Sequence, residues 1–359
     1  MKRTLVSILV LVAMLLSLCT GAFAEELETV TVVVPRSLEC LDDMSMWVAD
    51  AMGYFEEEGL KFNMEQAYGT SDVQMVATGQ ADLCCPSPNL TLPSIEAGLP
   101  VISVAHYDAI NIFGMAVRPD SGIETWEDLK GKTIALGDAA WQSIAAPTVV
   151  AAGLSVDDME WIVCGDARFQ MVGEGQVDVL FTWVSEYEQL LGQGFDFIYL
   201  DGNEVLPVFA NSFVASTSAV KDNPEKLKAF LRAQQKGMYF LLLSPEKGAD
   251  ITLNRFPAIQ VDWAAALGAA NGRNRQAFGL SEESAAATIA AGIGRGTDEA
   301  WAQFIEGAVS VGVLQAALDP SICYTNELLP DPLTEEEKAA IQADVDAYVC
   351  SSEVYLAAH

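Results

Sequence analysis

Histidine is almost absent from this chain of 359 residues, which contains only His106 and the C-terminal His359. Such scarcity argues against metal sites built on histidine and against Ser-His or Cys-His catalysis. The sequence also lacks the GxSxG, HExxH, GxGxxG and Walker motifs, which mark common hydrolases, metalloproteases and nucleotide-binding proteins. We therefore expect no catalytic set, no metal site and no cofactor.

Positive charge is scarce as well, since 19 Lys and Arg residues oppose 50 Asp and Glu residues and leave a net charge of −31. A surface this acidic repels phosphate backbones, so nucleic acid is not expected as a partner. Beyond the N-terminal segment, no stretch reaches the roughly 18 apolar residues that a membrane-spanning helix needs. A soluble mature chain is expected.

The N-terminal segment has the pattern of a signal peptide. Lys2 and Arg3 precede the apolar run 5–18, and Ala22-Phe23-Ala24 forms a small-x-small cleavage site. The sequence therefore predicts a signal peptide over residues 1–24 and an exported protein, periplasmic or at the cell surface. The alternative is a lipid anchor at Cys19, but Leu18 precedes it where that processing prefers Gly, Ala or Ser.

Six cysteines follow the signal segment, and an exported address permits disulfides. Their spacing is irregular and no CxxC pair occurs. The sequence permits one disulfide near the C-terminus, between Cys323 and Cys350. The adjacent Cys84 and Cys85 would point to opposite faces of a strand. We interpret them as two small buried residues.

About 335 residues remain after the signal peptide, more than one compact core usually holds, so two lobes are expected. Apolar strands alternate with helices, which predicts parallel α/β sheets. In lobe one we predict strands at 29–36, 60–67, 81–85 and 100–108, a helix from Asp43 to about Gly53, and a short helix opened by a capping box of Ser71 and Gln74.

The same alternation restarts after residues 111–119. We predict a short helix capped by Thr125 and Asp128, further helices at 140–153 and 167–173, and strands at 132–138, 159–165, 177–183 and 195–200. Asn223 and Pro224 then open the first of several helices that are expected to cover lobe one. The predicted division is 25–110 with 208–359 for lobe one and 111–207 for lobe two.

A nine-residue phrase occurs twice, as QMVATGQAD at 74–82 and QMVGEGQVD at 170–178. Each copy is predicted to be the end of a helix, a glycine that permits a left-handed stop, and an aspartate that enters the next strand. Asp82 and Asp178 would sit at the amino ends of their strands, whereas open parallel sheets bind ligands beyond the carboxyl ends. We therefore favour a structural role for both over a ligand contact.

Several phrases resemble one family of solute-binding proteins, the nitrate/sulfonate/taurine and thiamine-pyrimidine-precursor (NMT1/SsuA-like) group. They are SMWVADAMGYFEEEGLKF (45–62), ATGQADL (77–83), AGLPV (97–101), DSGIETWEDLKGKTIAL (120–136) and NPEKLKAFLRA (223–233). The resemblance implies a type II periplasmic-binding-protein-like fold with two lobes, each a mainly parallel sheet flanked by helices. Strands near 108–113 and 206–214 would join the lobes.

The same resemblance implies that the two lobes close on a small molecule and deliver it to an ABC permease and ATPase. A monomer is expected, because the two sheets are joined only by short crossings. Two alternatives share the fold class. One is an enzyme similar to thiamine-pyrimidine synthase, which needs histidines and a cofactor lysine that this chain does not visibly provide. The other is a ligand-sensing lobe of a signalling system.

Candidate ligand contacts are the polar and aromatic residues that follow the carboxyl ends of the predicted strands. In lobe one they are Arg36, Glu39, Ser87, Asn89, His106 and Tyr107. In lobe two they are Asp138, Trp141, Gln142, Ser143, Arg168, Thr182 and Trp183. For His106 a structural role is favoured over a ligand contact, and Trp47, which lies in the apolar stripe of its helix, is assigned to the core.

A few of these residues indicate which class of ligand is expected. Asp138 stands where sulfonate and nitrate binders would offer Ser, Thr or Gly, and a carboxylate repels an anion. An acid near two tryptophans suits a neutral or cationic ring. We therefore expect a pyrimidine-like or other nitrogen heterocycle, while Arg36 and Arg168 keep a sulfonate, carboxylate or nitrate as the alternative.

Overall fold

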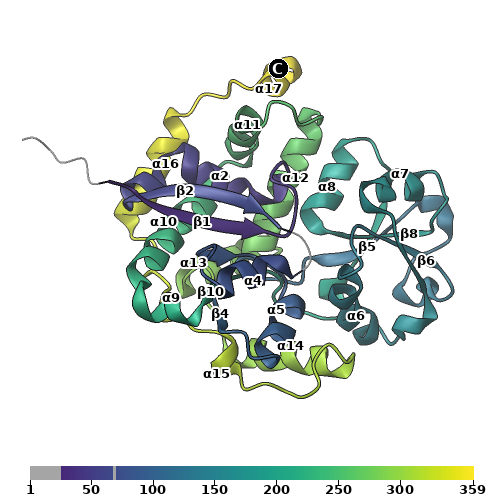
Figure 1. Ribbon diagram of the computed structural model, residues 1–359. Coiled ribbons are helices and arrows are strands. Elements are labelled where there is room, and N and C mark those ends of the chain that lie inside the picture. Colours follow the sequence, from purple (N-terminus) through teal and green to yellow (C-terminus); the bar gives the residue numbers. More distant parts are fainter. Residues whose placement is uncertain (1–25, 68–69) are drawn as a thin grey trace, which may run out of the picture.

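The computed structural model describes residues 26–67 and 70–359. The expected signal peptide over 1–24 and the alternative anchor at Cys19 lie outside the described residues. Figure 1 shows two lobes side by side, each built on its own sheet of five strands. The strand order is β2-β1-β3-β10-β4 in lobe one and β7-β6-β8-β5-β9 in lobe two.

The sheet of lobe one contains β1 (Glu28–Val34), β2 (Leu60–Gln66), β3 (Leu83–Cys84), β4 (Val101–His106) and β10 (Ser212–Ser216). β1 pairs in parallel with β2 and β3, whereas β10 is antiparallel to both β3 and β4. Four strands therefore share one direction. In β1 the successive residues Val32, Val33 and Val34 are all fully buried, as expected for a strand covered on both faces.

The sheet of lobe two contains β5 (Phe113–Val117), β6 (Thr133–Leu136), β7 (Glu160–Val163), β8 (Val179–Trp183) and β9 (Ile198–Asp201). β6 is parallel to β7 and β8, and β5 runs antiparallel to β8 and β9. β5 and β10 each follow a crossing between the lobes. Each thus runs antiparallel to the other four strands of its sheet. The predicted fold class, two α/β lobes with mainly parallel sheets, is confirmed.

The helices of lobe one are η1 (Leu41–Asp43), α2 (Met44–Ala51), α3 (Tyr54–Glu57), α4 (Ser71–Ala77) and α5 (Pro88–Glu96). The predicted capping box of Ser71 and Gln74 is wrong, because α4 begins at Ser71 and Thr70 occupies the N-cap without a side-chain hydrogen bond. Helix α5 was not predicted, since it contains Pro93 in its interior. Its N-cap is Ser87, whose Oγ accepts a hydrogen bond from Asn89 N at 3.4 Å.

The helices of lobe two are η2 (Pro119–Ser121), η3 (Trp126–Leu129), α6 (Trp141–Ala151), η4 (Val156–Asp158), η5 (Gly165–Ala167), α7 (Arg168–Gly173), α8 (Val184–Gly192) and η6 (Gly202–Glu204). The capping box of Thr125 and Asp128 is confirmed. Each remaining helix follows a strand or precedes one, but α8 was not predicted.

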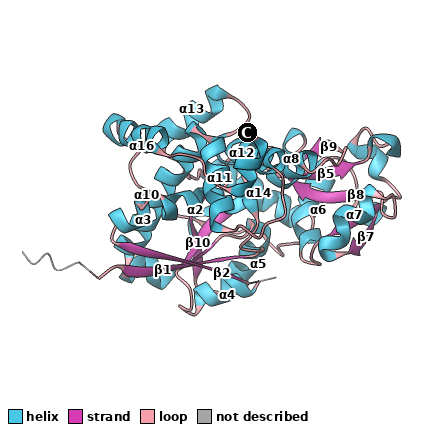
Figure 2. Cartoon of the chain, turned by 90° about the horizontal axis from the view of Figure 1, so that it is seen from above, coloured by secondary structure: helices cyan, strands magenta, loops and turns pink. Residues whose placement is uncertain are grey.

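The helices after β10 are α9 (Thr217–Asp222), α10 (Pro224–Leu243), α11 (Pro245–Arg255), α12 (Trp263–Phe278), α13 (Glu282–Ala291), α14 (Asp298–Ser310), α15 (Pro320–Cys323), α16 (Glu335–Ala347) and α17 (Glu353–Ala358). α10 and α11 pack on α2 of lobe one. In Figure 2 these helices lie on one side of the strands β1 and β2.

The expectation that these helices cover lobe one is wrong in part, because α12 packs along α8 and α14 packs on α6. Small residues bring α12 and α8 into backbone contact. A Cβ atom on Gly192 would lie 2.2 Å from Ala265 Cα, and one on Gly272 would lie 2.6 Å from Ser185 Cα. The two lobes are therefore joined by a helix pair as well as by the crossing segments.

The repeated phrase has one structural role in both lobes. Gly79 and Gly175 end their helices with φ of 72° and 75°. Asp82 Oδ2 accepts a hydrogen bond from the backbone N of Thr31 at 2.8 Å, and Asp178 Oδ2 accepts one from the backbone N of Thr133 at 2.9 Å. Each aspartate thus fixes the neighbouring central strand, and the structural interpretation is confirmed.

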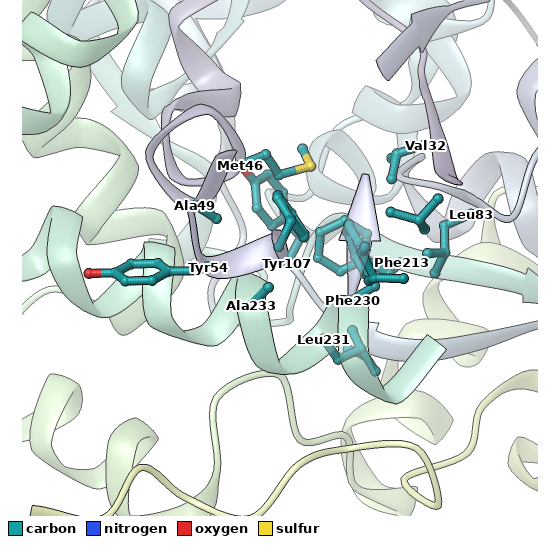
Figure 3. Close-up of a cluster of buried hydrophobic side chains, with 14 of the residues drawn as sticks. Val32, Met46, Ala49, Tyr54, Leu83, Tyr107, Phe213, Phe230, Leu231 and Ala233 are labelled. Carbon is teal, nitrogen blue, oxygen red and sulfur yellow. The ribbon is translucent and has the colours of Figure 1, made fainter. Parts of the chain in front are cut away.

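Figure 3 shows the core of lobe one, where Val32 and Phe213 of the sheet meet Met46 of α2 and Phe230 of α10. Trp47 belongs to this core, as predicted, and is 4% exposed. Lobe two has its own core around Phe181. The carboxyl ends of β1, β6 and β8 lie at the boundary between the lobes, where Pro35, Asp138 and Trp183 line one cavity.

Cys84 and Cys85 are both buried and belong to different apolar clusters, one on each face of the sheet, as predicted. The pair considered between Cys323 and Cys350 is wrong, because all six cysteines of the described chain are free. Cys323 instead packs beside Trp301.

Candidate functional site

One cavity lies between the lobes, at the carboxyl ends of strands from both sheets. The space between its walls, with the open mouth included, is about 640 Å³. Lobe one and the segment before β10 contribute Pro35, Arg36, Asp42, Ser87, Leu90 and Asn211. Lobe two contributes Ile112, Phe113, Asp138, Ala140, Trp141, Ile144, Phe181 and Trp183.

Two tryptophans form an aromatic wall of this cavity. Trp141 opens α6 and Trp183 ends β8, and their rings lie 5.7 Å apart at an angle of 81°. Gly137 makes room for Trp141, because a Cβ atom at that position would lie 2.5 Å from the indole ring. Trp183 is 9% exposed, and its buried Nε1 has no hydrogen-bond acceptor among the described residues.

Arg36 is the positively charged residue of the cavity wall, and its charge is compensated within the protein. Its Nε donates to Asp43 Oδ2 at 2.9 Å and its second nitrogen donates to Asp43 Oδ1. Burial alone would lower the pKa of Arg36, but Asp43 and Asp42 outweigh this and hold it well above its usual value. Burial raises the pKa of Asp43, although Arg36 opposes the shift.

Two carboxylates line the cavity beside this pair. Asp138 lies in the turn between β6 and α6, where its Oδ1 accepts a hydrogen bond from Ala140 N at 2.8 Å. Asp42 lies in η1 and is 3% exposed. The cavity wall therefore combines these two carboxylates with the aromatic rings of Phe113, Trp141, Phe181 and Trp183.

Five of the predicted contacts are brought together here: Arg36, Ser87, Asp138, Trp141 and Trp183. Three more, Asn89, Gln142 and Ser143, line an adjoining open groove between α5 and α6. That groove is also lined by Leu90 and Ala140, which border the cavity. A ligand larger than the cavity would extend into it.

Three predicted residues are buried near the cavity and bonded to protein partners. Tyr107 donates its hydroxyl hydrogen to the backbone oxygen of Asp42 at 3.0 Å. Arg168 and Thr182 both donate to Glu186, at 2.5 Å and 2.7 Å. The guanidinium of Arg168 also lies 5.0 Å from the centre of the Trp141 ring. These side chains support the wall and do not line the cavity.

The structure does not bring Glu39 and His106 to the cavity. Glu39 is exposed. His106 lines a separate hollow and stacks on Phe209 with ring centres 3.8 Å apart. Burial lowers the pKa of His106 to about 3, so the ring is neutral near pH 7.

The sequence reasoning missed several residues of the wall, chiefly Asp42, Phe181 and Asn211. Asp42 precedes a predicted helix rather than following a strand directly, and Phe181 lies inside a strand. Asn211 lies in the predicted crossing near 206–214, where no residue was predicted to contact the ligand.

Within residues 26–67 and 70–359, no cluster of three or more His, Cys, Asp or Glu side chains could hold a metal ion. In the same part of the chain, no helix combines the length and apolar character of a membrane span.

Comparison with known proteins gives a family. The family model described as NMT1/THI5 like matches residues 42–248. The riboflavin-binding protein RibY of Chloroflexus aurantiacus is 25% identical over 79% of this chain and 81% of its own length. The formylaminopyrimidine-binding protein of Halalkalibacterium halodurans is 27% identical over 72% of this chain and 83% of its own.

An enzyme matches as well. The 4-amino-5-hydroxymethyl-2-methylpyrimidine phosphate synthase of Aspergillus parasiticus is 24% identical over 82% of this chain and 88% of its own. Among solved structures, the periplasmic aliphatic sulphonate binding protein SsuA of Escherichia coli aligns with a TM-score of 0.61 at 15% identity. It covers 85% of this chain and 93% of its own, which shows a shared periplasmic-binding-protein fold.

Proposed function

Because this chain belongs to the NMT1/THI5-like family, we propose that it is an extracytoplasmic solute-binding protein of an ABC importer. It binds a small molecule in the cavity between its lobes and presents the closed, loaded form to a permease and its ATPase. Two relatives named as binding proteins support this assignment along most of the chain.

The observation that carries the proposal is the composition of the cavity wall. Arg36 and Asp42 come from lobe one, Asp138 and Trp141 come from lobe two, and all four border the same space. A ligand that contacts both lobes stabilises the arrangement in which they face each other. A permease can then recognise the closed shape whatever the ligand's chemistry.

We further propose that the ligand is a planar nitrogen heterocycle, pyrimidine-like or larger. The perpendicular indoles of Trp141 and Trp183 favour a ring, because aromatic groups prefer stacked or edge-on contacts. Asp138 supplies an acceptor for a ring nitrogen or an amino group. The names of both binding-protein relatives also denote nitrogen heterocycles.

The location and the lobe boundaries of the protein are proposed as follows. We propose that the protein acts as a monomer outside the cytoplasm, free or lipid-anchored. Lobe one would comprise 25–110 with 208–359, and lobe two would comprise 111–207. The permease and ATPase are the protein partners.

The enzyme alternative is disfavoured by the wall itself, since neither histidine nor lysine lines the described cavity. Incubation of purified protein with candidate pyrimidine precursors tests this point, because conversion of the precursor would establish an enzyme. A sensor role is distinguished by gene neighbourhood, since an adjacent ABC permease and ATPase gene pair indicates an importer.

A thermal-shift screen tests the ligand class. Aminopyrimidines, aromatic amines, alkyl sulfonates and nitrate are added to purified protein, because a ligand at 100 times its Kd adds about 2.7 kcal/mol to stability. We expect stabilisation by the heterocycles, with quenching of tryptophan fluorescence that Trp141→Phe reduces. Stabilisation by sulfonates or nitrate alone would contradict the heterocycle while leaving the importer function in place.

A further inference from the structure

Asp42 lines the cavity, and one of its carboxylate oxygens accepts no hydrogen bond from the described residues. Its Oδ1 accepts a hydrogen bond from Ser185 Oγ of lobe two at 2.5 Å. Its Oδ2 lies 3.7 Å from Arg36 Nε, too far for a hydrogen bond, and it accepts none from the residues that the structure describes. A side chain that is 3% exposed and lines a cavity thus keeps one acceptor available.

The buried charges around Asp42 do not balance. Arg36 is paired with Asp43, and Arg273 is paired with Asp108. Arg273 reaches Asp42 only at 3.9 Å. Three carboxylates therefore share two guanidinium groups, and all five side chains are at most 10% exposed.

The nearby charges of lobe two do not correct this excess. Arg168 is paired with Glu186, so that pair is neutral. Asp138 adds a further carboxylate to the cavity wall. Burial of an uncompensated carboxylate is strongly unfavourable, because it loses its hydration without gaining an equal partner. When all three carboxylates are ionised, the cavity therefore favours a positive charge and disfavours an anion.

We propose that the ligand carries a protonated nitrogen, an amine or amidine, and that Asp42 is the residue that binds it. This inference rests on the proposed solute-binding function. An N–H group at Oδ2 would complete the hydrogen bonding of Asp42 and offset the excess negative charge. The faces of Trp141 and Trp183 also attract a cation.

The position of Asp42 is fixed from several sides, so its acceptor is ready before the ligand arrives. Ser185, which donates to Oδ1, itself accepts a hydrogen bond from Gln276 Nε2 of α12 at 3.0 Å. The backbone oxygen of Asp42 accepts the hydroxyl hydrogen of Tyr107. Such preorganisation lowers the cost of binding.

Matched probes test the charge requirement. Benzylamine and benzyl alcohol, and 3-(aminomethyl)pyridine and 3-(hydroxymethyl)pyridine, differ in each pair by one protonated nitrogen. Calorimetry should give at least tenfold tighter binding of each amine by the unmodified protein. Asp42→Asn should lose this preference, whereas exposed Asp196→Asn should keep it. Equal affinities in the unmodified protein, or a preference that survives in Asp42→Asn, would overturn the inference.

A second variant separates charge from packing. Ser185→Ala removes the hydrogen bond to Oδ1 but leaves the carboxylate, so the preference for amines should persist. Without any probe, Asp42→Asn should melt at the same temperature as the unmodified protein or higher, since an excess charge is gone and Asn can still accept from Ser185. A clearly lower melting temperature would contradict the charge excess.

The two proposals fail in different ways. If heterocycles bind but neutral and cationic members bind alike, the solute-binding function stands and the role of Asp42 is wrong. If neither these probes nor any heterocycle, sulfonate or nitrate binds, the solute-binding function itself is wrong, and this inference falls with it.

Discussion

At the scale of single residues, the carboxylates of the cavity differ in how they are held. Asp138 uses one oxygen to shape the turn into α6, through its bond to Ala140 N. Asp42 is held by Ser185 across the lobe boundary. The first is a loop residue that the strand-end rule predicts, and the second depends on tertiary packing.

Replacement of Asp138 by Asn should separate ligand classes. For a ligand with an amino group or a cationic ring, affinity should fall by about 1.5 to 3 kcal/mol, the usual worth of a charged hydrogen bond. For an anion, affinity should be unchanged or improved, since a repelling carboxylate is gone. Titration calorimetry distinguishes these outcomes, and the turn is preserved because Asn Oδ1 can accept from Ala140 N.

His106 makes stability depend on pH. Its pKa falls from about 6.5 in the unfolded chain to about 3 in the folded protein, because burial disfavours the charged ring. Below pH 6.5 the unfolded state binds the proton more readily, so stability is complete above that pH and is lost as pH falls toward 3. The loss is about 1.4 kcal/mol per pH unit at most.

The variant His106→Phe should flatten this dependence, because it keeps the stacking on Phe209 and removes the titrating group. Urea unfolding at pH 7 and pH 5 should show a smaller loss of stability for the variant than for the unmodified protein. Equal losses would mean that the ring is accessible to protons in the folded state.

At the scale of elements, the sequence allowed the strands and most helices of both lobes to be predicted, because their apolar periodicity is strong. Helices α5 and α8 were missed, α5 because Pro93 lies within it. The strand-end rule drew attention to Arg36, Asp138 and Trp141, which the structure brings to one cavity. Asp42 could not be found in this way, because its place depends on how η1, α8 and α12 pack together.

The helix pair α8 and α12 should tolerate no added side chain at Gly272, where the two backbones are in contact. In Gly272→Ala the new Cβ would lie 2.6 Å from Ser185 Cα, so the helices must separate. Overpacking of this kind costs about 1 to 3 kcal/mol. Denaturant unfolding should show this loss for Gly272→Ala and little or none for Gly307→Ala in α14, where the nearest atom is 3.8 Å away.

At the scale of the whole molecule, the lobes meet through two crossing segments and through the contacts of α12 with α8 and of α14 with α6. We expect them to move relative to each other, because the ligand contacts come from both sides of the cavity. Small-angle scattering should give a smaller radius of gyration with a saturating ligand from the thermal-shift screen. An unchanged profile would indicate that binding needs no closure.

The strand order of lobe one also determines when this lobe can be completed as the chain emerges. β10 lies between β3 and β4, yet all of lobe two separates it from them in the sequence. Until residue 216 is available, the facing edges of β3 and β4 have no partner, whereas every strand of lobe two is already present by residue 201. The strands of lobe two are therefore all available before those of lobe one, although N-terminal units usually fold first. The lobe that begins the chain is the last to be completed.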